Sequence, residues 1–507
     1  MEHDFRRRAA AFALAALTLP LLGGCAQMVQ ERPLMDVSQQ AIEPGADVPE
    51  QDAYADHRER VTLYFVSAGG ERLVPVSREV TLSGGMSRAQ AALEALFAGP
   101  LEGETGATWP DKGSALAVRG LEVSGGVATV NLPARYRALN QEMLYAVRLA
   151  VASTLCSFSE ISYVNVLVGG REEGLDLGAT LPVGTFSGEE DLEALVRYGR
   201  LEDQRQSSEG FTCMTTMYVP AQGGDMLLPI VRSVAYAQAS PVDYLYTLLG
   251  EMGKGAGNEL AMQGVPAPMD YIEEMPEIVR PENGAYRAIE IRFSSQLDAA
   301  LEAASLTRGI YMAMLTDTLM GFVPGVEGVQ AYIGGELLTV LDAGDTPDGR
   351  EIALEQGLAT REHFAGYVGA PRTLYAQGLQ EGTLCRVRCV LPQARQAEPR
   401  ELLLALMQIS EEGRFALPDG FDEADVLAVC VEEENVVVNL SRAFGDALAA
   451  LEQEQARVAV YAMVNTLTQG RDQQGVIFFF EGEQLGELNG GLNMRGRLVR
   501  NPGMVVE

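Results

Sequence analysis

The sequence has few of the residues that most often carry catalysis, with only three histidines and one tryptophan among 507 residues. His3 lies in the N-terminal segment, while His57 and His363 lie in segments that we expect to be exposed. Trp109 follows no motif, and we expect it to pack locally rather than to anchor a partner at the surface. The motifs of nucleophile-elbow hydrolases, zinc metalloproteases and P-loop proteins are missing. We therefore expect no enzyme, no cofactor, no metal and no small-molecule ligand.

Positive charge is also scarce. Lysine and arginine number 38 against 70 aspartates and glutamates, so the formal net charge is -32. Nucleic-acid binding needs clustered cations that displace counterions from phosphates, so we expect no nucleic-acid partner. Beyond the N-terminal segment no run of about 18 apolar residues occurs, so no transmembrane helix is predicted there.

Cysteines are few and unevenly placed. Five of them follow Cys25, and an odd number cannot all pair within one chain. Cys385 and Cys389 lie four residues apart in a predicted strand, which separates their Cα atoms by about 13 Å. A disulfide requires about 7 Å or less. We expect free, mostly buried thiols, and pairing of Cys213 with a neighbour is the less favoured alternative.

The N-terminal segment has the pattern of a secretory signal, because arginines at 6–8 precede an apolar run at 9–22. Leu22-Gly23-Gly24-Cys25 follows and resembles the lipobox of bacterial lipoproteins. The resemblance implies a signal peptide at 1–24 and lipid chains, palmitate among them, on Cys25. Two or more chains anchor a protein stably. The alternative is an ordinary cleaved signal with a chance cysteine.

One pattern occurs three times in the rest of the chain. The copies open with Thr62-Leu63-Tyr64, Thr216-Met217-Tyr218 and Thr373-Leu374-Tyr375. A later helical run ends in each copy at Thr154-Leu155, Thr318-Leu319 or Thr466-Leu467. The starts lie about 155 residues apart, well beyond the roughly 20 to 50 residue period of solenoids. The pattern therefore predicts a tandem of domains.

Apolar periodicity and turn signals in the first copy predict strand, strand, helix, strand, strand, helix, strand. This order predicts an α+β fold, with two helices on one face of a mixed sheet. A flexible acidic tether is expected at 25–60, and a long loop at 250–281 makes the middle copy divergent. The predicted domains are residues 61–186, 211–342 and 372–507, with linkers at 187–210 and 343–371.

The first and third copies each carry further characteristic stretches. These are Leu96-Phe97-Ala98-Gly99-Pro100 and Gly126 to Leu132 in the first copy, and Val437 to Ser441 and Tyr461 to Thr468 in the third. Together they resemble the GerM domain of the sporulation and spore germination family. The resemblance implies a fold similar to ring-building domains. It also implies a lipoprotein that helps to assemble the channel complex between mother cell and forespore.

We therefore expect an extracytoplasmic lipoprotein, anchored through Cys25 to the outer face of the bacterial cytoplasmic membrane. We expect it to act as a non-enzymatic scaffold for protein partners of a transenvelope sporulation complex. The alternative is an envelope lipoprotein that binds a solute or peptidoglycan.

Overall fold

Small sheets and helices alternate along the part of the chain that the structure describes. The computed structural model describes residues 39–40, 48–84, 86–110, 120–176, 178, 180–193, 210–280, 287–393, 399–411, 414–432, 435–469, 475–489 and 491–506. Two compact units divide the chain after Val37, and every described residue belongs to the second. We call residues 57–193, 210–368 and 369–506 the first, second and third repeats.

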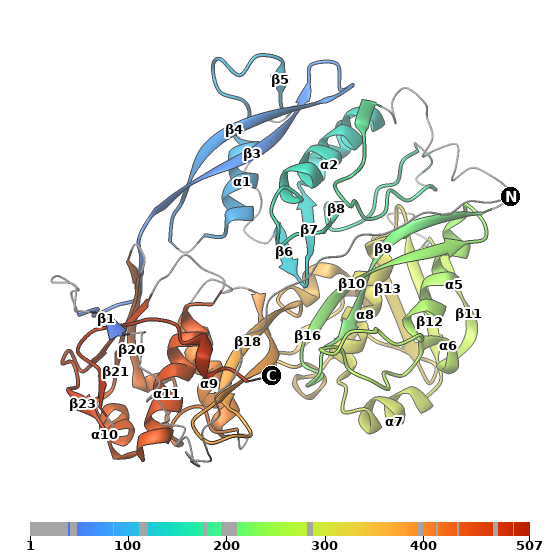
Figure 1. The fold of residues 1–507 in the computed structure, drawn as a ribbon. Helices are drawn as coiled ribbons and strands as arrows, with labels where there is room; N and C mark the ends of the chain where they lie inside the picture. Colours follow the sequence, from blue (N-terminus) through green and yellow to red (C-terminus); the bar gives the residue numbers. More distant parts are fainter. Residues whose placement is uncertain are drawn as a thin grey trace, which may run out of the picture. The chain divides into compact units, whose positions relative to one another are not determined.

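The first repeat opens with a long antiparallel hairpin, visible in blue in Figure 1. Its strands are β3 (His57–Ser67) and β4 (Leu73–Leu82), and β5 (Ala107–Thr108) pairs with the other side of β3. Helix α1 (Arg88–Phe97) begins at the predicted N-cap, because the Ser87 hydroxyl accepts a hydrogen bond from the Gln90 amide.

The second half of the first repeat is a mixed sheet. Strand β7 (Val127–Leu132) lies antiparallel to β6 (Leu121–Ser124) and parallel to β8 (Tyr163–Val168). The 3-10 helix η1 (Ala134–Ala138) and helix α2 (Gln141–Leu155) connect β7 to β8. The predicted α+β class is confirmed, and the opening hairpin forms a separate sheet from the mixed one.

The second repeat follows the same order. Its principal elements are β9 (Phe211–Pro220), β10 (Leu227–Tyr236), α5 (Pro241–Met252), α6 (Pro268–Tyr271), β11 (Ile272–Val279), β12 (Ala288–Phe293), α7 (Gln296–Ala303), α8 (Arg308–Met320) and β13 (Gly328–Ile333). The prediction of a loop at 250–281 is wrong for β11, which pairs antiparallel with β12. Only Pro276 of β11 is buried, so its sequence lacks the apolar alternation of a half-buried strand.

Residues 343–368 pack against the preceding part of the second repeat, although the sequence predicted a linker there. Strand β17 (Leu358–Ala359) pairs with β13, and Phe364 and Tyr367 belong to the second repeat's apolar core. The other short elements of this part are β14 (Glu336–Leu337), β15 (Val340–Leu341), η2 (Ala343–Asp345), β16 (Ile352–Ala353), η3 (Glu355–Gly357) and η4 (Arg361–Phe364).

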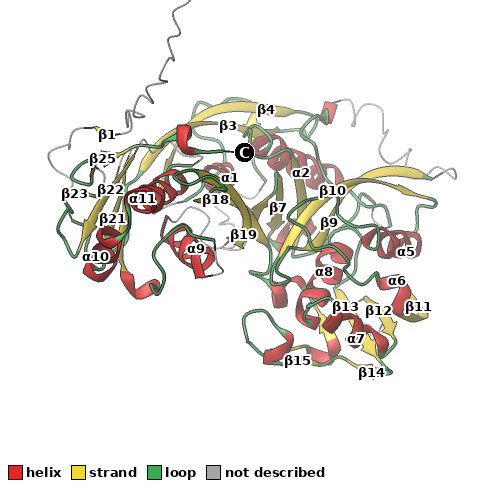
Figure 2. Ribbon diagram, turned by 60° about the horizontal axis from the view of Figure 1, so that its bottom comes forward, coloured by secondary structure: helices red, strands yellow, loops and turns green. Residues whose placement is uncertain are grey.

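The third repeat contains the hairpin of β18 (Gly369–Gln377) and β19 (Leu384–Pro392) and a larger mixed sheet. Strand β22 (Gly475–Phe480) is buried along its whole length and lies between β21 (Asn435–Leu440) and β25 (Arg497–Leu498), as Figure 2 shows. Its apolar sequence had predicted a central strand. The remaining elements are α9 (Pro399–Glu411), η6 (Glu423–Asp425), β20 (Val426–Glu432), α10 (Arg442–Ala450), α11 (Gln453–Leu467), β23 (Glu487–Leu488), β24 (Leu492–Asn493) and η7 (Pro502–Met504).

Two short strands before the first repeat complete the sheet of the third. Strand β1 (Gln39–Gln40) pairs with β25, and β2 (Ala53–Tyr54) pairs with β20. The Asp52 carboxylate also accepts a hydrogen bond of 2.8 Å from the Val429 amide. The open edges of a sheet offer unpaired backbone groups to any extended segment. The prediction of a flexible tether therefore does not hold for residues 48–60.

Trp109 and the five cysteines after Cys25 lie within the described residues, where their predicted environments can be tested. The five cysteines form no disulfide with one another: Cys213 and Cys430 are buried, and Cys156, Cys385 and Cys389 are half-buried. Trp109 is only 3% exposed, and its indole donates a 3.1 Å hydrogen bond to the Tyr136 hydroxyl, so it packs locally. None of the helices in the described ranges has the length and hydropathy needed to cross a bilayer.

Candidate functional site: one tyrosine position in three repeats

The structure describes some of the predicted site residues and not others. Cys25, the predicted lipid attachment residue, and His3 lie outside the described residues. His57 is exposed on β3, and the His363 ring caps η4 by accepting a hydrogen bond from the Thr360 amide. Across the described ranges, no group of three or more His, Cys, Asp or Glu side chains could hold a metal ion.

The tyrosine that opens each repeat makes the same backbone contact in all three. Its amide donates a hydrogen bond to the threonine hydroxyl near the end of the long helix: Tyr64 to Thr154 at 3.0 Å, Tyr218 to Thr318 at 2.9 Å and Tyr375 to Thr466 at 3.2 Å. An amide at a strand edge costs free energy when it is buried without a partner. The recurring Thr-x-Tyr and Thr-Leu landmarks therefore fasten the first strand of each repeat to its long helix.

A second position is equivalent in the three repeats because the sheets have the same pairing. The last long strand of each mixed sheet pairs with a returning segment: Val164 with Phe186, Val329 with Ala359, and Val476 with Leu498. The residue two positions after the returning partner is Gly188 in the first repeat, Arg361 in the second and Arg500 in the third. This residue decides what covers the tyrosine.

In the second repeat Arg361 covers the tyrosine. The guanidinium carbon lies 5.0 Å from the centre of the Tyr218 ring, and Nη2 donates a 3.1 Å hydrogen bond to the Tyr218 hydroxyl. Nη1 also donates to the Asp317 carbonyl at 2.9 Å and lies 3.4 Å from its carboxylate. Burial raises the pKa of Tyr218 to about 12, so the hydroxyl is protonated at neutral pH.

The first repeat contributes two side chains to this site. The Thr129 hydroxyl lies 2.9 Å from the Tyr218 hydroxyl, and the Glu122 carboxylate lies 3.4 Å from Arg361. Burial raises the pKa of Asp317 to about 7 against the opposing effect of Arg361, and Glu122 raises it further. One guanidinium cannot neutralise two buried carboxylates, so one of them stays protonated below that pH.

In the third repeat Arg500 plays the same part. Its Nη2 donates a 2.6 Å hydrogen bond to the Tyr375 hydroxyl, and its guanidinium carbon lies 5.8 Å from the ring centre. Asn465 occupies the helix position of Asp317, and it binds the backbone of Asn501 through both atoms of its amide group. The site is therefore closed by the segment that follows β25.

In the first repeat the position is open. Gly188 offers no side chain, and a pocket of about 470 Å³ lies beside Tyr64. The residues lining it are Tyr64, Arg72, Leu73, Ser153, Cys156, Ser157, Gly188, Glu190, Asp191, Leu192 and Glu193. Ser153 occupies the helix position that Asp317 and Asn465 hold in the other repeats. Burial, with the nearby Glu190 carboxylate, raises the pKa of Cys156 to about 11, so this thiol is not a nucleophile at neutral pH.

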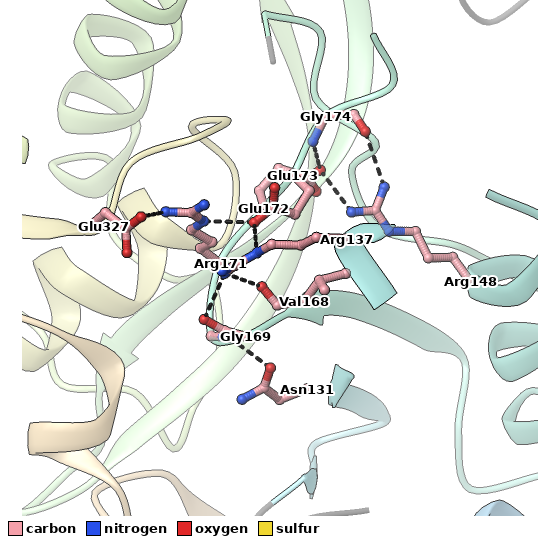
Figure 3. Close-up of polar contacts among 11 residues, drawn as sticks. Asn131, Arg137, Arg148, Val168, Gly169, Arg171, Glu172, Glu173, Gly174 and Glu327 are labelled. Carbon is pink, nitrogen blue, oxygen red and sulfur yellow. Dashed lines mark hydrogen bonds and ion pairs between the residues drawn. The ribbon is translucent and has the colours of Figure 1, made fainter. Parts of the chain in front are cut away.

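A further polar cluster joins the first repeat to the second, and Figure 3 shows its side chains. The Glu173 carboxylate accepts hydrogen bonds from Arg137 at 2.5 Å and from Arg171 at 2.6 Å, while Arg171 also pairs with Glu327 of the second repeat. Behind them lies the fully buried pair of Arg148 and Glu172. These charges are engaged with one another, so the cluster is an internal connection between the two repeats.

Comparisons with known proteins identify the domain type. Residues 62–174 and 382–486 match the sequence model of a family called Germane, described as "Sporulation and spore germination". The first and third repeats each contain a segment that matches this domain family. The resemblance to the GerM domain is thereby confirmed, and the family match supports a role connected with sporulation. Tyr64 lies within the matched segments, whereas Gly188 and Arg500 lie outside them.

Solved structures similar to this chain include two sporulation-related or lipoprotein structures. The tandem GerMN domains of the sporulation protein GerM from Bacillus subtilis are 16% identical, and the alignment covers 60% of this chain and 100% of that one at a TM-score of 0.22. A putative lipoprotein from Clostridium perfringens is 18% identical, with 27% of this chain and 91% of that one covered at a TM-score of 0.17. No curated protein matches.

Sequence reasoning singled out the tyrosine positions but missed their arginines. Phe186 and Leu498 follow their strand partners Val164 and Val476 at the same spacing. That equal spacing aligns Gly188 with Arg500 and could have shown the difference between the first and third repeats. In the second repeat a longer insertion precedes Ala359, so no such spacing leads to Arg361.

Proposed function

We propose that this protein is a membrane-anchored assembly factor that acts through protein contacts during spore formation or germination. The match of the first and third repeats to the Germane family carries this proposal. The lipobox resemblance at Leu22-Gly23-Gly24-Cys25 supports anchoring on the outer face of the cytoplasmic membrane, through lipid on Cys25. The partners are then proteins of a complex between mother cell and forespore.

The use of polar side chains between the repeats supports a scaffold rather than an enzyme. The buried hydroxyls of Thr129 and Tyr218 join the first repeat to the second, and the ion pair of Arg361 with Glu122 does the same. Buried polar groups in satisfied networks specify one arrangement of the elements that they connect. A protein that positions partners needs such fixed connections between its modules.

Deletion of the gene in its host tests the proposal. We expect fewer heat-resistant spores or slower germination, restored by the wild-type gene. A gene that encodes the Cys25→Ala variant should restore fewer heat-resistant spores, because the variant protein would carry no lipid. Fractionation should then find the variant protein outside the membrane. Normal numbers of heat-resistant, normally germinating spores in the deletion strain would refute the sporulation role. Membrane retention of the Cys25→Ala protein would refute the anchor alone.

The open pocket favours a second candidate, a lipoprotein that binds a solute or peptidoglycan. Its volume of about 470 Å³ falls within the range of small-molecule sites. A ligand that binds only the folded state raises the midpoint of thermal unfolding. Thermal-shift measurements with muropeptides and small solutes would support this candidate if one of them raises the midpoint in the wild type but not in a Glu190→Gln variant.

A further inference from the structure

The three tyrosine sites differ in where their guanidinium comes from. In the second and third repeats the chain supplies its own arginine, and in both the guanidinium donates to the tyrosine hydroxyl. Each guanidinium carbon also lies within 6 Å of the tyrosine ring centre, which is the range of a cation–π contact. The recurrence of both contacts in two repeats indicates that this position is built to hold a guanidinium.

Residue 188 cannot supply the guanidinium in the first repeat. Gly188 has a φ of +79°, which side chains rarely adopt, and a Cβ placed there would lie 2.5 Å from the Cβ of Cys156. The helix residue is the small Ser153 instead of Asp317 or Asn465. The backbone therefore excludes a side chain at 188 while the volume of the missing arginine stays open as the pocket.

The remaining charges of the pocket suit a cation. Oε1 of Glu190 accepts hydrogen bonds from the Ser187 amide and hydroxyl, while its Oε2 is buried and has no hydrogen-bond partner. A buried carboxylate oxygen without a partner is costly and is stabilised by any donor that reaches it. Asp191 and Glu193 also line the pocket, and Arg72 is the one cation among its described lining residues.

We propose that the Tyr64 pocket of the first repeat receives the side chain of an arginine from a second protein chain. The guanidinium stacks on the Tyr64 ring and donates to the phenolic oxygen, as Arg361 and Arg500 do at their own tyrosines. It also reaches Oε2 of Glu190, as Arg361 reaches the Glu122 carboxylate. The planar fork of arginine can make several of these contacts at once. A lysine ammonium is compact and more strongly hydrated, so the pocket selects arginine over lysine. This inference depends on the proposed function in one respect only. It assumes that the arginine comes from a protein, as the proposed action through protein contacts does.

Ligand-observed NMR on the full chain in detergent micelles tests the pocket without a known partner. The probes are N-acetyl-arginine amide and N-acetyl-lysine amide, read by saturation transfer and by competition between them. We expect the arginine probe to bind measurably more tightly. A Glu190→Gln variant should weaken its binding at least about tenfold, which corresponds to about 1.4 kcal/mol, because it loses a hydrogen bond to a charged group. A Glu102→Gln variant, at an exposed position outside the pocket, is the matched control and should bind as the wild type does.

Several outcomes would overturn the proposal. Equal binding of the two probes would show a non-selective acidic surface. Unchanged binding in the Glu190→Gln variant, with its thermal midpoint preserved, would place the arginine elsewhere. Absence of binding by the arginine probe would reject the pocket as a guanidinium site, whatever the deletion strain shows. These results are separate from spore counts, so the pocket can fail while the sporulation role holds.

The source of the arginine is settled by the oligomeric state. If a second copy of this chain supplies it, the protein self-associates in light scattering, and the Glu190→Gln variant and the arginine probe both reduce the association. If another protein supplies it, the chain stays monomeric and still binds the probe. Both results support the proposal, and self-association that neither change affects would exclude a second copy as the source.

Discussion

The Tyr218 and Tyr64 sites share one backbone framework and differ in what covers the ring. Around Tyr218 an arginine, an aspartate and two groups from the first repeat meet in a buried cluster. Around Tyr64 the corresponding positions carry Gly188 and Ser153, and a pocket is left. The comparison shows that the hydrogen bond from tyrosine amide to threonine belongs to the fold, whereas the arginine does not.

The same comparison explains how the repeats are joined. The Tyr218 site is closed on one side by its own Arg361 and on the other by Glu122 and Thr129 of the first repeat. A tyrosine position of this fold can therefore act as a docking point for a neighbouring module. In the first repeat no described residue donates to the Tyr64 hydroxyl, so this docking point is still open within the described chain.

Replacing the arginine of the filled site should give the largest effect. Arg361→Met keeps the unbranched stem of the side chain but leaves Asp317 and Glu122 without their cation. Removing one partner of a buried ion pair costs about 3 to 5 kcal/mol, because the other charge stays buried and uncompensated. We expect faster hydrogen exchange in α8 and β9, measured by mass spectrometry, and a lower thermal midpoint.

The matched control is Arg72→Met, which removes an exposed arginine beside the open pocket. Exposed substitutions of this kind usually change stability by about 0.5 kcal/mol or less. Similar losses from the two variants would show that the filled and open sites do not differ in the way that the structure indicates.

The pH dependence of stability should distinguish the two sites next. The folded pKa of Asp317 is raised from 3.8 to about 7 by burial, so the folded state binds this proton more tightly than the unfolded state does. The stabilisation is complete below pH 3.8 and is lost as the pH rises to about 7. Over this range the free energy of unfolding falls by at most about 1.4 kcal/mol per pH unit.

Asp317→Asn isolates this contribution, because asparagine keeps the shape and cannot ionise. The difference in unfolding free energy between variant and wild type should shift in favour of the variant from about pH 4 to about pH 7 and stay constant above. Ser153→Ala, at the same helix position in the first repeat, should leave the pH profile unchanged. A constant difference between Asp317→Asn and wild type would mean that Asp317 is ionised throughout.

The parts of the fold that repeat could be predicted from the sequence, and the parts that differ between copies could not. The opening strand of each repeat was predicted from Thr62-Leu63-Tyr64 and its two later forms. The central strand β22 was predicted from Val476 to Phe480. These elements follow from local apolar patterns. By contrast, β11 is an exposed edge strand and β2 is a two-residue strand, and neither has a periodic signal.

The candidate site depends on tertiary pairing, which explains why sequence reasoning did not reach it. Arg361 meets Tyr218 only because β17 returns to β13 after a long insertion, and Glu122 reaches the same cluster from another repeat. The role of Gly188 becomes clear only when its position is compared with those of Arg361 and Arg500. A glycine in a loop gives no such signal in the sequence.

Removing the tyrosine hydroxyl should give the smallest effect and the sharpest comparison. Tyr218→Phe deletes a buried group that bonds to both Arg361 and Thr129, and we expect a loss of about 1 to 3 kcal/mol because both partners stay buried. Tyr64→Phe deletes the hydroxyl of a tyrosine that lines the open pocket, and stability should change by about 0.5 kcal/mol or less. Thermal unfolding of the two variants measures both. A loss at Tyr64 equal to that at Tyr218 would mean that its hydroxyl already has a partner within the chain, and the pocket would then have no free phenol to offer.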